Sequence, residues 1–294
     1  MKIVILHGGS IRAFNSLQNA RAIYADFVKK GKTSDVTMYE VDTEGNLLQA
    51  GVKTSVHAVF PLIDHVIDTT FLHKFKNEYK NLAHKLGVAM HLSTEIDNYN
   101  HRKILNQIDI DHPSHYVIKS SDENKSYMLH EMWRKMHMPI IIKSPKKFTS
   151  SLVTYNPQEA LEYIIGIHAR GDDAVIDEYS RHKVYTIFTI KRYRGEHVYT
   201  TPVVELFKSK NLTASKSKYI QASMLSDSNK KSLYNAAKSV ALHIDDSIVR
   251  VNLSVDKAGN IKVLHTSTKP DYHEGQIMYG VFGDYGINFA DILN

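Results

Sequence analysis

The segment that most constrains the fold is Arg250–Asp271, RVNLSVDKAGNIKVLHTSTKPD. Apolar residues alternate along its first half, as in a strand with one buried face: Val249, directly before the segment, then Val251, Leu253 and Val255. The second half is expected to pair back through Ile261, Val263 and the region of Leu264. Turn-forming residues separate the halves at Asp256–Asn260, so the segment is predicted to form a β-hairpin. The polar residues of this hairpin mark the expected ligand site: Arg250, Asn252, His265 and Ser267.

The composition is that of an ordinary globular protein. With 294 residues, of which 43% are hydrophobic and 23% charged, the chain suits two or three packed subdomains. The absence of cysteine excludes disulfides and thiolate chemistry, and it fits an intracellular protein. The apolar run in MKIVILHGG is too short for a signal peptide, and no run approaches the roughly 20 residues of a membrane span. We therefore expect a cytoplasmic protein that does not contact membranes.

The net charge of +6 raises the question of nucleic-acid binding. The lysines are spread along the chain, and no nucleic-acid-binding motif accompanies them. A lysine-rich surface is the simpler interpretation, and nucleic acid is not the expected partner. The 17 histidines show no spacing typical of a metal site.

The first third of the chain alternates between expected strands and helices. Strands are predicted at Ile3–Leu6, Val36–Val41 and Ala58–Ile63, and helices at Ser16–Lys30 and Phe71–Leu86. Gly8 and Gly9 allow a tight turn after the first strand. This alternation favours a parallel sheet.

The rest of the chain has longer helices between strands. Helices are expected at Asp97–Gln107, Glu123–Met136, Asn156–His168 and Asp227–Ile244. Strands are expected at Tyr116–Lys119, Met138–Lys143, Ala174–Tyr179, Val184–Ile190 and Val198–Leu206. The Ser- and Lys-rich stretch Asn211–Lys218 is predicted to be a mobile loop.

Five segments, in this order, resemble the D-alanine–D-alanine ligase family of the ATP-grasp superfamily: LHGG (6–9), residues 57–88, PIIIKS (139–144), TPVVEL (201–206) and residues 250–270. The resemblance implies an α/β and α+β architecture in which a Rossmann-like N-terminal domain precedes a two-lobed ATP-grasp fold. The implied domains are residues 1–95, a central lobe at 96–174 and a C-terminal lobe at 175–294. The two lobes would hold ATP between them, and family members commonly form homodimers through the N-terminal domain.

The resemblance also implies nucleotide-binding residues. Lys143 matches the lysine that contacts the phosphates, although a surface lysine at a strand end is the alternative. Ser150 and Ser151 lie in the implied phosphate loop, which here lacks the family's glycines. Asp177, Glu178 and Tyr179 match the adenine-binding linker, and Lys183 falls where the family has the glutamate that binds the ribose. The first lysine of the family's inter-lobe helix falls on Tyr99, so the adenine pocket is retained only in part.

The implied metal ligands have been replaced. The family takes an aspartate, a glutamate and an asparagine from the hairpin, where this chain has Asn252, His265 and Ser267. Mg²⁺ prefers carboxylate oxygens, so we expect no two-Mg²⁺ centre and doubt any Mg²⁺ requirement. A site for a softer metal at Asn252 and His265 is one alternative, and an ordinary histidine on the hairpin face is the other.

The substrate residues are also altered. Arg250 matches the arginine that stabilises the oxyanion, and Ser16 matches the family serine beside the glutamate that orients the first D-alanine. The orienting glutamate is missing from Ala13–Asn15, the loop Phe207–Lys218 has no tyrosine, and Asp271 replaces a glycine.

Three functional hypotheses follow. The first is a pseudoenzyme that has lost Mg²⁺-dependent ligation but binds a nucleotide or a small molecule. The second is an active, divergent ATP-dependent carboxylate–amine ligase, which would take metal ligands from elsewhere, for example Asp256 or Glu274. The third is an unrelated binding role for the basic surface.

Overall fold

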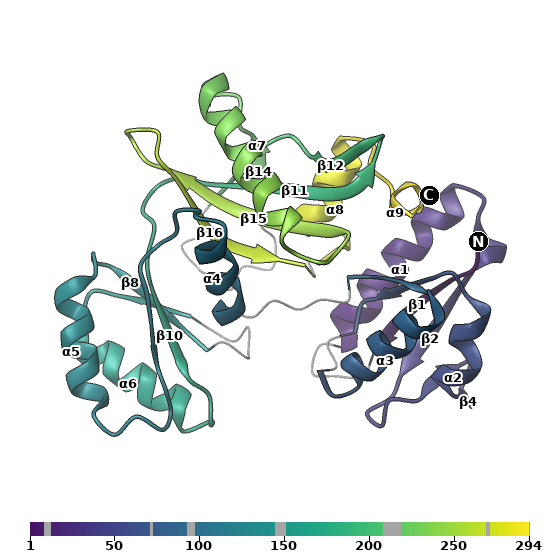
Figure 1. Ribbon diagram of the computed structural model, residues 1–294, viewed down its shortest axis with the longest axis horizontal. Helices are drawn as coiled ribbons and strands as arrows, with labels where there is room; N and C mark the ends of the chain where they lie inside the picture. The colour runs from purple at the N-terminus through teal and green to yellow at the C-terminus, as the bar shows by residue number, and fades with distance from the viewer. Residues whose placement is uncertain are drawn as a thin grey trace.

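The computed structural model describes residues 1–8, 13–70, 73–92, 98–144, 151–207, 219–268 and 271–293, and Figure 1 shows their arrangement. The described strands form three β-sheets, each of which has helices packed against it. None of the helices in these ranges has the length and apolarity needed to cross a membrane.

The first sheet has the strand order β4-β3-β2-β1-β5-β6. Its strands are β1 (Ile3–Gly8), β2 (Val36–Val41), β3 (Leu47–Gln49), β4 (Val52–Thr54), β5 (His65–Asp68) and β6 (Ala89–His91). Strand β1 pairs in parallel with β2 and β5, which confirms the parallel sheet, whereas β3 and β4 extend it in antiparallel pairing. Its long helices are α1 (Ala13–Lys29) and α3 (His73–Leu86), and a 3₁₀ turn, η1 (Thr33–Asp35), precedes β2.

The predicted strand at Ala58–Ile63 is wrong. These residues belong to a short helix, α2 (Val56–Val59), and a 3₁₀ turn, η2 (Phe60–Leu62). The Ser55 side chain caps the helix by accepting a hydrogen bond from the backbone N–H of His57 at 3.2 Å. Pro61 has no N–H to donate to a strand ladder, and the buried strand begins later, at β5.

The second sheet is antiparallel, with the order β7-β10-β8-β9. Its elements are β7 (His115–Ile118), α5 (Lys125–Lys135), β8 (Ile140–Lys143), β9 (Leu152–Thr154), α6 (Pro157–His168) and β10 (Ala174–Glu178). The predicted start of α6 is confirmed, because Asn156 caps it and Pro157 occupies the first turn. The predicted domain division between residues 174 and 175 falls inside β10, which pairs with β7 and β8.

The third sheet has the order β14-β13-β11-β15-β16, with β12 paired to β11. Its strands are β11 (Val184–Tyr193), β12 (Glu196–Thr200), β13 (Val204–Leu206), β14 (Tyr219–Gln221), β15 (Ile248–Val255) and β16 (Ile261–Ser267). Strands β15 and β16 confirm the predicted hairpin. The strand predicted at Val198–Leu206 is instead two strands, interrupted around Pro202.

Each face of the third sheet has a different neighbour. One face buries Val249, Val251 and Leu253 against α7 (Asp227–Leu242), and Leu105 of α4 (Asn98–Gln107) completes that core. At one end, the other face packs Phe188 against α1 and the C-terminal helices α8 (Ile277–Asp284) and α9 (Phe289–Ile292). The chain therefore returns at its C-terminus to the first sheet, as Figure 1 shows for α9 and α1.

A buried carboxylate connects these distant segments. Asp26 of α1 is 4% exposed and accepts hydrogen bonds from the Tyr272 hydroxyl at 2.6 Å and the Phe289 N–H at 3.2 Å. Asn19 of the same helix accepts from the Tyr272 N–H at 2.8 Å. The first and third sheets consequently share one core, with polar groups that fix its alignment.

Candidate functional site

A buried group of charges lies on the second sheet and α4. Lys143 ends β8, and its Nζ lies 2.6 Å from Oδ2 of Asp177 on β10. The other oxygen of Asp177 accepts a hydrogen bond from Arg102 Nη2 of α4 at 2.9 Å. Arg102 and Asp177 are each 3% exposed. Burial alone would raise the pKa of Asp177, but Lys143 and Arg102 hold that pKa below its ordinary value, so the carboxylate is ionised.

The polar face of the hairpin forms a second group. Arg250 lies opposite Ser267, and Asn252 lies opposite His265, across the β15–β16 ladder. Oδ1 of Asn252 accepts hydrogen bonds from Arg250 Nε at 3.1 Å and from the Thr186 hydroxyl at 2.5 Å. A register shift after Asn252 introduces Leu264 as an extra residue on β16. The face that bears these polar groups is opposite to the one packed on α7.

Two histidines lie between the groups. The rings of His101 and His265 are 6.0 Å apart, and Nδ1 of His101 lies 2.7 Å from the Thr266 hydroxyl. Burial, and then the charges of Lys143 and Arg250, lower the pKa of His265 to about 3, so its imidazole is neutral. Burial likewise lowers the pKa of His101. Because His101, next to Arg102 on α4, lies against His265 of the hairpin, the two groups adjoin. They are here called the interlobe cluster, whose members are Arg102, Lys143, Asp177, Arg250, Asn252 and His265.

Asp271 adds one more charge beside Arg250. Burial lowers the pKa of Arg250 to about 10, while the negative charge of Asp271 opposes that shift. Oδ1 of Asp271 is buried and has no hydrogen-bond partner among the residues that the structure describes. The net charge of this region is therefore positive, because the cations Arg102, Lys143 and Arg250 exceed the carboxylates Asp177 and Asp271 by one.

A cavity of about 400 Å³ adjoins the interlobe cluster. It is lined by Pro113, His137, Met138, Glu178, Tyr179, Ser180, Arg181, His182, Ser254, Asp256, Asn260 and Lys262. Glu178 directly follows Asp177 on β10, and Ser254 lies two residues beyond Asn252 on β15, so the cavity lies further along two of the strands that carry the cluster. Glu178 accepts a hydrogen bond from the His137 N–H, and Arg181 donates to the Met138 carbonyl at 2.6 Å, which fixes the wall between β8 and β10.

The structure brings most of the predicted site residues together. Lys143, Asp177, Arg250, Asn252 and His265 belong to the interlobe cluster, with Ser267 opposite Arg250. Glu178 and Tyr179 line the adjoining cavity. Ser151 is half-buried at the start of β9, whereas Ser150 and the side chain of Tyr99 lie outside the described residues, as does the predicted mobile loop Asn211–Lys218.

Other predicted residues have local partners. Lys183 is exposed and pairs with Glu205 at 2.9 Å. The Ser16 hydroxyl is fully buried, accepts a hydrogen bond from the Gly8 N–H at 3.0 Å and lies 3.2 Å from the Thr69 hydroxyl. Asp256 accepts hydrogen bonds from the backbone N–H groups of the hairpin turn, and Glu274 is exposed.

Three residues at this site, Arg102, His101 and Thr186, were not predicted from the sequence. Arg102 lies three residues before Leu105, which is fully buried, so the two side chains share a face of α4. The sequence did carry one signal: an arginine at helical spacing from a core leucine predicts a buried guanidinium. Such a guanidinium requires a partner.

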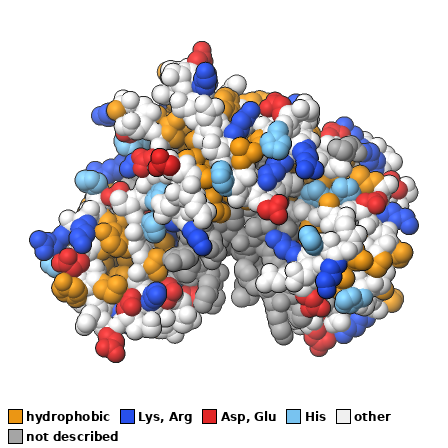
Figure 2. Space-filling view, viewed as in Figure 1, with side chains coloured by type: hydrophobic (Ala, Val, Ile, Leu, Met, Phe, Trp, Pro, Cys, Tyr) orange, Lys and Arg blue, Asp and Glu red, His pale blue; other side chains and the backbone are white. Residues whose placement is uncertain are grey.

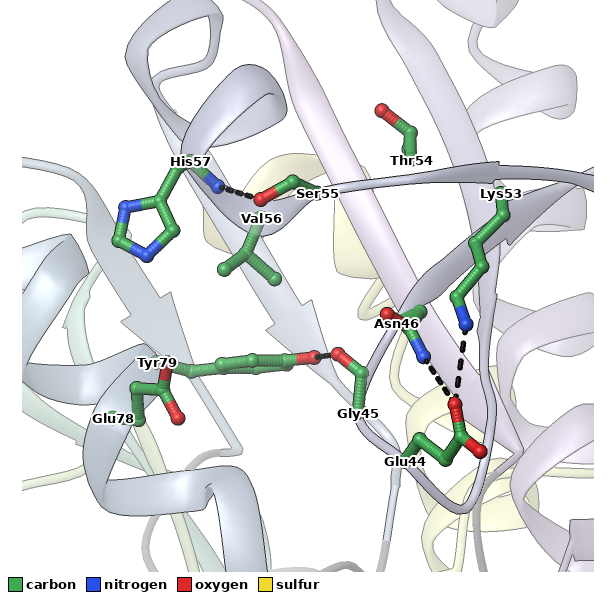
Figure 3. Close-up of a pocket in the computed structure, with 10 residues that line it drawn as sticks. All are labelled: Glu44, Gly45, Asn46, Lys53, Thr54, Ser55, Val56, His57, Glu78 and Tyr79. Carbon is green, nitrogen blue, oxygen red and sulfur yellow. Dashed lines mark hydrogen bonds and ion pairs between the residues drawn. The ribbon is translucent and has the colours of Figure 1, made fainter.

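A further cavity of about 420 Å³ lies on the first sheet, and Figure 3 shows ten residues that line it. The Tyr79 hydroxyl donates to the Gly45 carbonyl, and Lys53 pairs with Glu44 at 3.1 Å. These contacts join α3 and β4 to the turn after β2.

The surface charge is mixed. On the face shown in Figure 2, lysine and arginine side chains are interspersed with aspartate and glutamate over all three sheets. This distribution differs from the basic stripe that nucleic-acid-binding surfaces present.

Neither a protein-family model nor a curated protein matches the sequence. Solved structures do match. D-alanyl-alanine synthetase A from Vibrio cholerae aligns with a TM-score of 0.79 and 13% identity, over 100% of this chain and 96% of that one. The D-alanine–D-alanine ligase from Bacillus anthracis complexed with ATP aligns with a TM-score of 0.74 and 14% identity, over 100% and 94%. The VanG D-Ala:D-Ser ligase from Enterococcus faecalis aligns with a TM-score of 0.72 and 13% identity, over 99% and 97%. The chain therefore has the ATP-grasp fold of the D-alanine–D-alanine ligases.

Proposed function

We propose that this protein binds a nucleotide between its second and third sheets and does not catalyse Mg²⁺-dependent ligation. The observation that carries the proposal is the state of Asn252. The family resemblance assigns a metal-binding aspartate to this position, but the amide oxygen here accepts hydrogen bonds from Arg250 and Thr186. A neutral amide oxygen that already accepts two hydrogen bonds offers a divalent cation no negative charge.

The remaining groups do not fit Mg²⁺ either. This ion prefers carboxylate oxygens, whereas His265 offers a buried neutral imidazole surrounded by positive charges. In the described part of the chain, no three His, Cys, Asp or Glu side chains are arranged to hold a metal ion. The alternative metal ligands Asp256 and Glu274 are a turn residue and an exposed residue, respectively.

The groups present suit the phosphates of a nucleotide without a metal. Lys143, Arg102 and Arg250 supply fixed positive charge, and an ammonium has three donors, so Lys143 can hold Asp177 and a phosphate oxygen together. The cavity beside Glu178 and Tyr179 provides a place for the base, at the linker that the resemblance assigns to adenine. The match to a ligase complexed with ATP supports this assignment.

The test is calorimetric titration of the protein with a non-hydrolysable ATP analogue, with and without Mg²⁺. We expect binding that does not strengthen when Mg²⁺ is added, and no phosphate release from ATP with D-alanine. The Lys143→Ala variant should bind the analogue about tenfold more weakly, whereas Lys135→Ala, which removes an exposed lysine of α5, should stay within about twofold. Binding that requires Mg²⁺, or turnover with D-alanine, would favour an active divergent ligase instead.

A further inference from the structure

A third cavity, of about 360 Å³, lies between α4 and the edge strand β7. It is lined by Arg102, Lys103, Asn106, Gln107 and His115. Four of these residues come from successive turns of one face of α4, and His115 begins β7 opposite Asp177. The cavity therefore touches the interlobe cluster only through Arg102.

The two terminal nitrogens of Arg102 differ in their surroundings. Its Nη2 pairs with Asp177, while its Nη1 is buried and has no hydrogen-bond partner among the described residues. The residue is 3% exposed, and a buried charged donor without an acceptor is costly. Since Arg102 lines the cavity, a ligand oxygen there would supply the missing acceptor.

The charges around the cavity favour a doubly charged anion. Arg102 and Lys143 share the single negative charge of Asp177, which leaves one positive charge, and the exposed Lys103 adds another. The two amides contribute neutral N–H donors, so the lining can donate to several oxygens of one ligand. Burial, and then the charge of Arg102, lower the pKa of His115, which leaves this wall neutral.

We propose that the cavity between α4 and β7 binds a small phosphate-type oxyanion, held by Arg102 Nη1 and the ammonium of Lys103, with the amides and His115 around it. This α4–β7 site is distinct from the proposed nucleotide site, because Arg102 alone among its lining residues belongs to the interlobe cluster and none of them lines the cavity beside Glu178 and Tyr179. It requires neither a metal nor a nucleotide.

The experiment is titration of the protein with inorganic phosphate at constant ionic strength, with chloride as the competing anion. We expect saturable binding that weakens about tenfold or more in Lys103→Glu, because the substitution reverses a charge beside the anion. The matched control is Lys135→Glu on the exposed surface of α5, which should change phosphate affinity by less than about twofold. Arg102→Lys keeps a positive charge to pair with Asp177 but removes the second terminal nitrogen of the guanidinium. This variant should also bind phosphate more weakly.

Two variants distinguish the α4–β7 site from the proposed nucleotide site. Lys103→Glu should leave the affinity for the ATP analogue unchanged, whereas Arg250→Met should weaken the analogue and spare phosphate. The inference is overturned if the protein does not bind phosphate, or if Lys103→Glu or Arg102→Lys binds it as well as the original chain does. It is also overturned if Lys135→Glu loses as much affinity as Lys103→Glu, or if Arg250→Met abolishes phosphate binding.

Discussion

Lys143 and Asp177 approach to 2.6 Å on neighbouring antiparallel strands, two residues apart along the ladder. The same carboxylate also holds Arg102, so one buried negative charge neutralises two cations from β8 and α4. This triad connects the second sheet to the helix that packs on the hairpin. The residue expected to contact adenine therefore acts as the electrostatic link between the two halves of the site.

Asp177→Asn should strongly destabilise the fold. The substitution removes the only anion paired with Arg102 and Lys143 among the described residues and leaves two charges without compensation. Loss of one partner from a buried ion pair typically costs about 3–5 kcal/mol, and we expect a decrease near the lower end because Lys143 is partly exposed. Urea unfolding followed by circular dichroism measures the change.

Glu131→Gln is the matched control for Asp177→Asn. Glu131 pairs with Arg134 and Lys135 on the surface of α5, where the loss should be below about 1 kcal/mol. Equal losses in both variants would contradict a structural role for the buried triad.

Sequence patterns predicted the elements well where the apolar periodicity was long, as in α1, α7 and the hairpin. They failed at Ala58–Ile63, because a short apolar run does not distinguish a strand from a capped helical turn. The resemblance pointed to Lys143, Asp177 and Arg250, which the structure places in one cluster, but it did not point to their partners. Arg102 and Thr186 reach the site from distant segments, and this proximity depends on how the sheets pack, which local patterns do not encode.

Acid should destabilise the protein between pH 6.5 and pH 4. Burial, and then the neighbouring His65, lower the pKa of His91 to about 4, and burial lowers that of His265 to about 3. The unfolded chain binds these protons near pH 6.5, so the stabilisation is present above that pH and is lost as the pH falls. We expect the free energy of unfolding to decrease by about 1–2 kcal/mol per histidine between pH 7.5 and pH 5.

Urea titrations of the protein at the two pH values measure this loss. His91→Gln should reduce the difference between them, because it removes one of the protonating groups. His243→Gln, at an exposed position after α7, should leave the difference unchanged. A free energy of unfolding that is independent of pH in this range would contradict burial of neutral imidazoles.

Tyr272→Phe should loosen the contact between the first and third sheets. The Tyr272 hydroxyl donates to Asp26, and its removal leaves a buried carboxylate with one fewer donor. The expected loss of stability is about 1–3 kcal/mol, measured by thermal or urea unfolding. Tyr127→Phe, at an exposed tyrosine of α5, is the control and should be nearly neutral. Similar stability in the two variants would mean that the hydrogen bond to Asp26 contributes little.

Restoring carboxylates at the hairpin should create a metal requirement. In an Asn252→Asp, His265→Glu double variant, two carboxylates would face each other across the β15–β16 ladder, near Lys143 and Arg250. Carboxylates are the ligands that Mg²⁺ prefers, so we expect Mg²⁺ to strengthen binding of the ATP analogue by about tenfold or more, unlike in the original chain. Calorimetry with and without Mg²⁺ measures the difference, and Asn252→Asp alone should give a smaller gain. If Mg²⁺ does not strengthen binding in the double variant, the two missing carboxylates are not what separates this site from a metal-dependent one.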